Sequence, residues 1–240
     1  MLSQHDSQTS WDAAQRTASL GIFVWESTDL LTWTNERVVT VEDKTAGMVW
    51  APEAIWDPTK SQYLVYWASR FFSASDTKHT GTRSNAKIRY AYTSDFLTFT
   101  PPATYIDYNP TDLIDLTILP FKGDMQTFAR FLKDETNKKV FSEISTTGLF
   151  GTWTRVGGAN AVIQSGVEGP AAYWDNDVAG KAHLLLDFYG GDGYAPYEST
   201  DVKGGKWMAS SKSGFPTGLR HGSVLPVDQG QFDALKKKWG

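Results

Sequence analysis

The stretch Ser27-Thr28-Asp29-Leu30, closed by the aromatic residue Trp33, decides the fold because the chain repeats it. Further copies begin at Thr93 and Ser199, and a degenerate copy begins at Thr146. The closing aromatic residues are spaced by 66, 54 and 54 residues, at Trp33, Phe99, Trp153 and Trp207. A repeat of this length, in a chain of short aromatic-rich strands, is typical of a β-propeller with one copy in each blade.

Short runs of β-branched and aromatic residues lie between the turns, bounded by Gly, Pro, Asp, Asn or Ser, and they predict strands. The clearest runs are Gly21–Trp25, Tyr63–Trp67, Lys87–Tyr92, Met125–Leu132, Val140–Ile144 and His183–Phe188. Only the tail Gln231–Trp239 has a helical period. We expect two longer polar loops, Phe72–Ala86 and Asp187–Tyr197, over one rim. Because no Gly/Ser-rich or Pro-rich linker divides the chain, we predict one all-β domain over residues 1–240.

Composition argues against several classes of partner. The 240 residues include 23 Lys or Arg against 27 Asp or Glu, and no basic stripe is present, which argues against nucleic acid. The absence of cysteine excludes disulfides and thiolate metal sites. No apolar run approaches the roughly 20 residues of a membrane helix, and Met1–Asp6 lacks the pattern of a secretory signal. We therefore expect neither a nucleic acid nor a membrane partner.

A second set of segments accompanies the turns, and each begins an apolar run with a polar residue. These residues are spaced by 62, 53 and 53 positions, at Glu53, Asp115, Glu168 and His221. Taken singly, each has an ordinary interpretation as a turn carboxylate, a cap or a core histidine. In a propeller, however, the innermost strands of the blades surround one axis. Because the four residues share a phase of the repeat, we expect them to point at one shared polar site.

Carboxylates that converge on such an axis suit the hydrolysis of glycosidic bonds. The reaction needs one protonated carboxyl group for the leaving oxygen and a second, ionised one as base or nucleophile. The acid needs a raised pKa, which the charge of a neighbouring carboxylate can supply. We therefore expect Glu168 to be the general acid and Asp115 to tune and orient it.

The chain resembles glycoside hydrolase family 43, the five-bladed propeller arabinofuranosidases, arabinanases and β-xylosidases. The segments that carry the resemblance are Trp11–Thr17, Val24–Leu30, Trp50–Ala54, Ile114-Asp115, Glu168–Pro170 and Arg220–Gly222. The resemblance implies an inverting glycosidase for arabinose- or xylose-containing plant polysaccharide, in a family that is usually secreted. That family uses an Asp base, a second Asp that modulates pKa and a Glu acid. By resemblance, Asp115 is the pKa modulator and Glu168 the general acid.

The resemblance also implies substrate-binding residues. Trp50 would line the pocket for the terminal sugar, and Asp12 would border it. Arg220 and His221 would lie near the propeller axis, where some relatives hold a calcium ion or a water. No cofactor is required for the reaction, and the partner is a carbohydrate substrate.

The sequence departs from the family where the base is expected. The base belongs to the first blade, in an Arg-Asp-Pro-like segment, and a step of 53 to 62 residues before Glu53 falls at or before the start of the chain. We therefore predict an incomplete five-bladed propeller, with part of blade one, blades two to four and the inner strand of blade five at Arg220–Val227. The base would then be absent from this chain. Asp6 and Asp12 are poor replacements, because an inverting base must stand roughly 6.5–9.5 Å from the acid.

Incomplete closure has a further consequence. Unpaired strand edges invite pairing with another chain, so we expect self-association. A non-catalytic carbohydrate-binding propeller is the alternative function. A WD-type interaction propeller fits less well, because its repeat is about 40–45 residues long. The choices between arabinose and xylose, and between exo and endo cleavage, stay open at this point.

Overall fold

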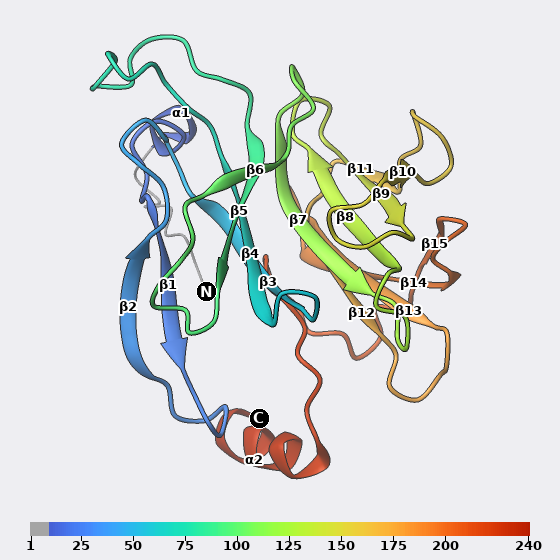
Figure 1. Ribbon diagram of the computed structural model, residues 1–240. Helices are drawn as coiled ribbons and strands as arrows, with labels where there is room; N and C mark the ends of the chain where they lie inside the picture. Colours follow the sequence, from blue (N-terminus) through green and yellow to red (C-terminus); the bar gives the residue numbers. More distant parts are fainter. Residues whose placement is uncertain (1–9) are drawn as a thin grey trace.

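The computed structural model describes residues 10–240, and antiparallel strands dominate it (Figure 1). The first sheet contains β1 (Gly21–Glu26) and β2 (Thr34–Thr40). The second contains β3 (Trp50–Asp57), β4 (Gln62–Ser69), β5 (Lys87–Thr93) and β6 (Ala103–Ile106). The third contains β7 (Leu113–Pro120), β8 (Phe128–Asp134), β9 (Lys139–Ser145), β10 (Trp153–Arg155) and β11 (Gln164–Ser165). The fourth contains β12 (Glu168–Trp174), β13 (Ala182–Phe188), β14 (Gly193–Asp201) and β15 (Lys206–Ala209).

The repeated turn joins the last two strands of each sheet. After β1, the Ser27 hydroxyl accepts a hydrogen bond from Leu30 N (2.8 Å), and at the end of β5 Thr93 Oγ1 accepts one from Phe96 N (2.9 Å). In the third copy Ser145 provides this hydroxyl and accepts from Thr147 N, so the copy begins one residue earlier than the predicted Thr146. Because these side chains replace missing backbone partners, the turn is a local structure that sequence can specify. By this correspondence β1 and β2 match the last two strands of the later sheets.

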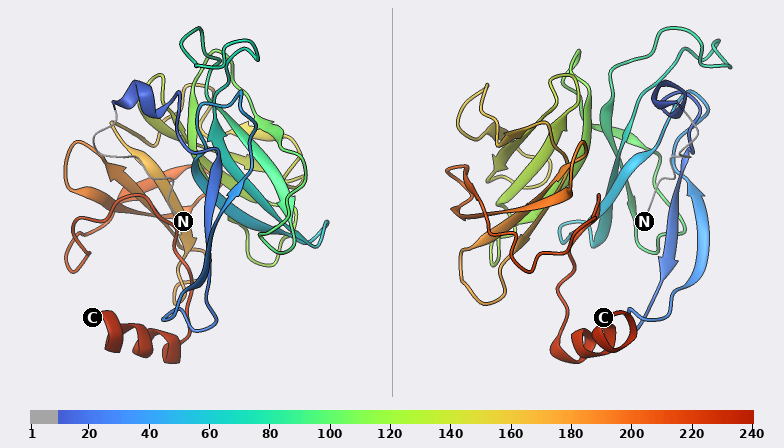
Figure 2. Two further views of the ribbon diagram at one scale, coloured as in Figure 1. Left: turned by 90° about the vertical axis from the view of Figure 1, so that its left-hand side faces the viewer. Right: turned by 180° about the vertical axis from the view of Figure 1, so that it is seen from behind.

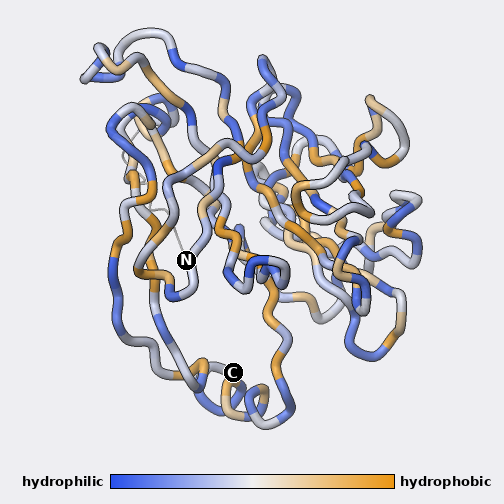
Figure 3. The backbone as a smooth tube through the Cα atoms, in the orientation of Figure 1, coloured by the Kyte–Doolittle hydropathy of each residue, from blue (hydrophilic) through white to orange (hydrophobic). Residues whose placement is uncertain are grey.

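The sheets pack in the order of the sequence. One apolar cluster joins the first sheet to the second, another the second to the third, and a third cluster joins the third to the fourth. Representative pairs are Ile22 with Trp67, Leu64 with Leu132, and Phe131 with Leu184. Within residues 10–240 no such cluster joins the fourth sheet to the first, so the sheets form an open row. Figure 3 shows hydrophobic residues along the strands and mostly hydrophilic loops.

The first strands of three sheets, β3, β7 and β12, lie innermost, and β7 contacts both β3 and β12. Each has a register shift near its start, between Trp50 and Glu53, Ile114 and Thr117, and Glu168 and Ala171. A residue in the left-handed region lies inside each shift: Ala51 (φ 47°), Asp115 (φ 53°) and Gly169 (φ 52°). Such bulges redirect side chains. Because the same bulge occurs in three sheets, the strained backbone of Asp115 belongs to the fold.

The structure confirms the six predicted strand runs, with small differences at their ends, and the predicted helix. That helix is α2 (Gln229–Trp239), which stands away from the four sheets (Figure 2). A short helix, α1 (Trp11–Ala14), was not predicted. The expected loop Asp187–Tyr197 is wrong, because β13 extends to Phe188 and only residues 189–192 separate it from β14. None of the helices in residues 10–240 is long and apolar enough to cross a membrane.

The predicted inner strand of a fifth blade is also wrong. Residues 220–227 form no strand, because within residues 10–240 they have no neighbouring strand to pair with. This segment and the residue before it are instead held to the fourth sheet by single hydrogen bonds. Tyr194 N donates to Leu219 O (2.8 Å), and Gly222 N donates to the Tyr194 hydroxyl (2.9 Å). The segment is thus held against β14 without being part of a sheet.

Candidate active site

Three of the four predicted polar residues meet at one place. Asp115 of β7, Glu168 of β12 and His221 each present a polar atom, and these three atoms lie within 4.8 Å of one another. The residues are more than fifty positions apart in sequence, so only the packing of the first strands brings them together. We call this group the central cluster. The predicted convergence is therefore confirmed for these three residues.

The bulges in β7 and β12 hold the cluster in place. Gly169 N donates a hydrogen bond to Asp115 Oδ2 (3.0 Å), which links the two bulges directly. Gly169 also leaves room for the imidazole, because a Cβ atom at this position would lie 2.5 Å from His221 Cδ2. The Tyr194 hydroxyl lies 2.8 Å from the Gly169 carbonyl oxygen and accepts from Gly222 N, so it ties the His221 segment to β12.

Lys133 is a member of the site that the sequence did not reveal. Its side chain is 2% exposed, and its Nζ lies 2.6 Å from Glu168 Oε2 and 2.6 Å from Glu135 Oε2. The predicted strand ended at Leu132, whereas β8 continues to Asp134 and carries Lys133 inward. The available signal was a lysine directly after the predicted strand, because a buried ammonium group requires an anionic partner.

Asp187 was also missed. It is fully buried on β13, opposite Glu168 in the register of the fourth sheet. Its Oδ2 accepts a hydrogen bond from Arg220 Nε (2.7 Å) and lies 3.5 Å from His221 Nε2. Arg220 Nη2 is 3.7 Å from Glu168 Oε1, so Arg220 lies at the edge of the cluster, and its expected contact with substrate stays a prediction. A carboxylate inside the apolar run His183–Phe188 was the signal for Asp187.

The charges in the cluster place its proton on the histidine. Burial alone would raise the pKa of Glu168, but hydrogen bonds from His221 and Lys133 outweigh burial and lower it to about 2. Burial lowers the pKa of His221, but Glu168, Asp115 and Asp187 outweigh it, so the net shift is upward. Burial raises the pKa of Asp115. The expected raised pKa of Glu168 is therefore wrong for the free protein, because Lys133 stabilises its ionised form.

Glu53 lies outside the central cluster. Its Oε1 accepts a hydrogen bond from Thr117 Oγ1 (3.0 Å), and burial raises its pKa to about 7. The bulges explain the misplacement: Glu53 and Thr117 follow the register shifts, whereas Asp115 lies inside one. The counterpart of Asp115 in β3 is Ala51, so the true spacing is 64 residues (51→115) and not 62. The expectation that Glu53 occupies the same position of the repeat as Asp115 is thus wrong by two residues.

Trp50 takes the position in β3 that Glu168 takes in β12, directly before the bulge. Its ring lies 4.8 Å from the ring of Trp11 in α1. The two ring planes are tilted by 45° to each other, and the face of a single indole is a surface on which a sugar ring can stack. The placement is compatible with the substrate-binding role expected for Trp50.

Asp12 has a structural role. Its two carboxylate oxygens bind Arg16 Nε (2.7 Å) and Arg83 Nη1 (2.9 Å). Hydrogen bonding to Arg16 is the main cause that lowers the pKa of Asp12. These ion pairs tie α1 to the loop 70–86, and the contact with sugar expected for Asp12 stays a prediction. Asp6, the other candidate base, lies outside the described residues.

A cavity of about 490 Å³ opens beside the cluster. Arg220 and Tyr194 line it, together with the turn Gly191–Gly193 and residues 215–218. Cavities of about 300–1,000 Å³ are typical of ligand sites. Arg220 connects this cavity to Glu168, but the three residues of the central cluster do not line it.

The donors in the cluster fit calcium poorly. Calcium takes six to eight oxygen ligands, whereas both oxygens of Glu168 and one of Asp115 already accept hydrogen bonds or ion pairs. Lys133 and Arg220 add two positive charges beside Glu168. This donor set suits a hydrogen-bonded water better than a cation.

Comparisons with known proteins agree with the resemblance. The sequence model of a family described as a probable glycosyl hydrolase domain, related to glycoside hydrolase family 43, matches residues 2–233. An α-L-arabinofuranosidase of Bifidobacterium longum subsp. longum is 35% identical over 161 residues, covering 58% of this chain and 15% of that protein.

Solved structures show the same fold. An exo-β-1,3-galactanase of Phanerochaete chrysosporium, with β-1,3-galactotriose, matches with a TM-score of 0.56 at 14% identity, over 82% of this chain and 44% of its own. A family 43 β-1,3-galactosidase matches with a TM-score of 0.53 at 15% identity, over 80% and 40%. The chain thus spans less than half the length of these relatives, and identities this low support the fold alone.

Proposed function

The chain belongs to the family of probable glycosyl hydrolase domains related to glycoside hydrolase family 43, and on that premise we propose that it cleaves glycosidic bonds in arabinose- or xylose-containing plant polysaccharide. The observation that carries the proposal is the convergence of Asp115, Glu168 and His221 within 4.8 Å. Hydrolysis of a glycosidic bond requires carboxyl groups close to the reacting atoms. We place Glu168 as the general acid and Asp115 as its pKa modulator.

In this proposal the reactive proton belongs to a pair of residues. His221 Nε2 lies 3.1 Å from Glu168 Oε1, and the two groups titrate together. In the free protein the proton rests on the imidazole. A glycosidic oxygen that reaches Glu168 Oε1 would receive this proton through the carboxyl group, and His221 would become neutral.

The distance between the carboxyl groups limits the mechanism. Asp115 and Glu168 offer oxygens within 4.8 Å of each other, and an inverting acid–base pair needs roughly 6.5–9.5 Å. Asp115 therefore fits the role of modulator better than that of base. Asp187 is fully buried against Arg220, which keeps a reacting water away from it. We propose an inverting reaction whose base is none of these three carboxylates, and without that base hydrolysis should be severely impaired.

The rate at which p-nitrophenol is released from aryl glycosides tests the proposal. The chain should release p-nitrophenol from the α-L-arabinofuranoside faster than from the β-D-xyloside or the β-D-galactoside, because the relative with the highest sequence identity cited above is an arabinofuranosidase. Proton NMR of the first product on an arabino-oligosaccharide should show the inverted anomer. A retained anomer would contradict the inverting mechanism and favour a retaining carboxylate pair, whose spacing is about 5–5.5 Å.

One observation favours the alternative of a carbohydrate-binding module without activity. Lys133 and His221 hold Glu168 in its ionised form, and an ionised carboxylate cannot protonate a leaving group. Calorimetry with arabinotriose separates the two functions. Binding without any product from the three p-nitrophenyl glycosides would establish the binding module.

The proposed proton pair predicts a particular pH profile. His221 has a raised pKa, so the pair keeps its proton below about pH 6.5 and loses it as the pH rises through the higher value in the folded protein. We expect the alkaline limb of kcat to lie above pH 6.5. In His221→Gln the limb should move to lower pH by at least one unit, because Lys133 alone then lowers the pKa of Glu168. An unchanged limb, measured from pH 4 to 9, would contradict the pair.

A further inference from the structure

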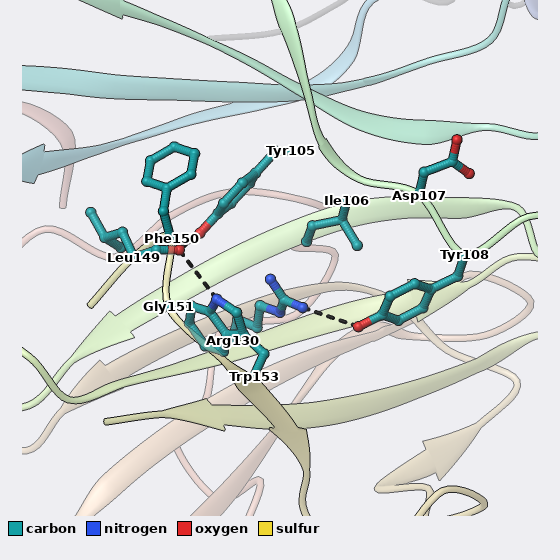
Figure 4. A pocket seen from close by; sticks show the side chains of 9 residues that line it. All are labelled: Tyr105, Ile106, Asp107, Tyr108, Arg130, Leu149, Phe150, Gly151 and Trp153. Atoms are coloured by element: carbon teal, nitrogen blue, oxygen red, sulfur yellow. Dashed lines mark hydrogen bonds between the residues drawn. The ribbon is translucent and has the colours of Figure 1, made fainter. Parts of the chain in front are cut away.

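A second cavity lies between the second and third sheets, and its lining residues are not members of the central cluster (Figure 4). Its volume is about 290 Å³. β6 and the residues after it form one wall, and β8, the turn 149–151 and the start of β10 form the other. The size is close to the lower limit of ordinary ligand pockets, which suits one small ring.

Aromatic rings provide most of the apolar surface. The lining includes Tyr105, Tyr108, Phe150 and Trp153 (Figure 4). Phe150 is 51% exposed although it is a large apolar residue. Its ring packs against Tyr90 and Tyr105, with 5.0 Å between centroids in each case, so its orientation is set by its neighbours. A fixed and exposed aromatic ring is a surface for stacking, since binding costs it little conformational entropy.

Hydrogen-bonding groups are held at the bottom of the same cavity. Arg130 is only 4% exposed, and its Nε donates to Glu143 Oε2 (2.7 Å). Its Nη2 donates to the Tyr108 hydroxyl (3.1 Å), and the guanidinium group lies 4.2 Å from the Trp153 ring. The other terminal nitrogen points into the space between Tyr105 and Ile106 (Figure 4). A buried cation therefore presents a donor to the cavity from a fixed position.

The charged residues that line the cavity balance each other. Arg130 and Asp107 are the charged residues of the lining. Glu143 lies 2.6 Å from Arg130 Nη2, and Lys87 Nζ lies 2.6 Å from Asp107 Oδ2. A phosphate or a uronic acid would meet an arginine whose charge is already neutralised. Stacking surface together with fixed hydrogen-bonding groups and no net charge fits a neutral sugar.

We infer that this cavity is an accessory binding site for one neutral sugar ring of a polysaccharide, stacked on Phe150 and hydrogen-bonded to Arg130 and Tyr108. It lies toward the outer strands of the two sheets, so a polymer held there would extend along the surface beside the protein's core. The site would lengthen the time for which the polymer stays bound and would leave the rate of cleavage of small glycosides unchanged.

The experiment uses the full chain with Glu168→Gln, so that no sugar is consumed. Arabinotriose is titrated while the indole N–H signals are followed by NMR. The Trp153 signal, assigned through Trp153→Phe, should shift saturably. Phe150→Ala and Phe150→Leu should each weaken this binding roughly tenfold. Leu97→Ala removes another exposed apolar side chain, one that does not line the cavity, and should bind like the parent.

Several outcomes would overturn the inference. A Trp153 signal that does not move, or Phe150 variants that bind like the parent, would do so. Tighter binding of galacturonic acid than of arabinose would contradict the charge argument. Phe150→Leu keeps most of the apolar volume, so it stays informative if Phe150→Ala unfolds. Saturable binding at Trp153 in a chain with no hydrolytic activity would support this site and contradict the proposed hydrolase.

Discussion

Glu168→Gln should lower the hydrolysis of aryl glycosides with poor leaving groups by about 10²–10⁴-fold, the usual contribution of a general acid. The amide has the shape of the carboxyl group but cannot deliver the proton of the Glu168–His221 pair. Asp115 cannot replace it, because its Oδ2 is occupied by Gly169 N. The loss should appear in kcat more than in KM, since the missing interaction forms only in the transition state.

The leaving group provides the decisive control. A 2,4-dinitrophenyl glycoside has a leaving group that departs without protonation, so Glu168→Gln should retain most of its turnover. Equal losses for both substrates would show that Glu168 is not the acid. Glu198→Gln, on β14 and paired with Lys181 (2.9 Å), is the matched carboxylate variant outside the cluster, and it should behave like wild type.

Lys133→Met should lower the free energy of unfolding by about 3–5 kcal/mol at pH 7, the usual cost of removing one partner from a buried ion pair. Lys133 is almost fully buried and lies 2.6 Å from both Glu135 and Glu168. Without it, two carboxylates face each other with no cation between them. Chemical denaturation followed by tryptophan fluorescence measures the loss. Lys138→Met is the control, because Lys138 pairs with the same Glu135 from an exposed position and should change stability by less than about 1 kcal/mol.

The loss should depend on pH with a definite sign. The pKa of Glu168 falls from its ordinary value of 4.5 to about 2 in the folded protein. Its contribution to stability is therefore complete above pH 4.5 and disappears as the pH falls toward 2. The difference between wild type and Lys133→Met should be largest above pH 4.5 and should narrow below it. A difference that stays constant down to pH 2 would mean that Lys133 acts through packing alone. In the variant the pKa of Glu168 should rise, which would move the pH profile of kcat as well.

Some of the site was readable from the sequence, because local chemistry specified it. The Ser or Thr hydroxyl at residues 27 and 93 accepts a hydrogen bond within its own turn, so the motif predicts the turn wherever it occurs. Short apolar runs between these turns predicted six strands. The repeat then aligned Asp115, Glu168 and His221 in one region, although one of the four aligned residues, Glu53, was displaced by the bulge.

Other parts of the site depended on long-range packing. Lys133 and Asp187 lie at or inside apolar strand runs, where sequence alone does not reveal which face a side chain occupies. The low pKa of Glu168 follows from its hydrogen bonds with His221 and Lys133, and a neighbouring strand of another sheet supplies that lysine. The predicted strand at residues 220–227 failed for the same kind of reason, since a strand requires a partner and the described residues offer none.

The sequence by itself determined the turn motif, the strands and the family, because each of these rests on residues within a short segment or on a regular spacing. Only the tertiary structure decided which charged groups meet. Asp115 lies inside the bulge of β7, whereas Glu168 lies directly before the bulge of β12, so the two bulges decide how these side chains are directed. The strand β8 brings the buried Lys133 to Glu168. Electrostatic interactions depend on distances across sheets, and therefore the protonation state of Glu168 is a property of the fold.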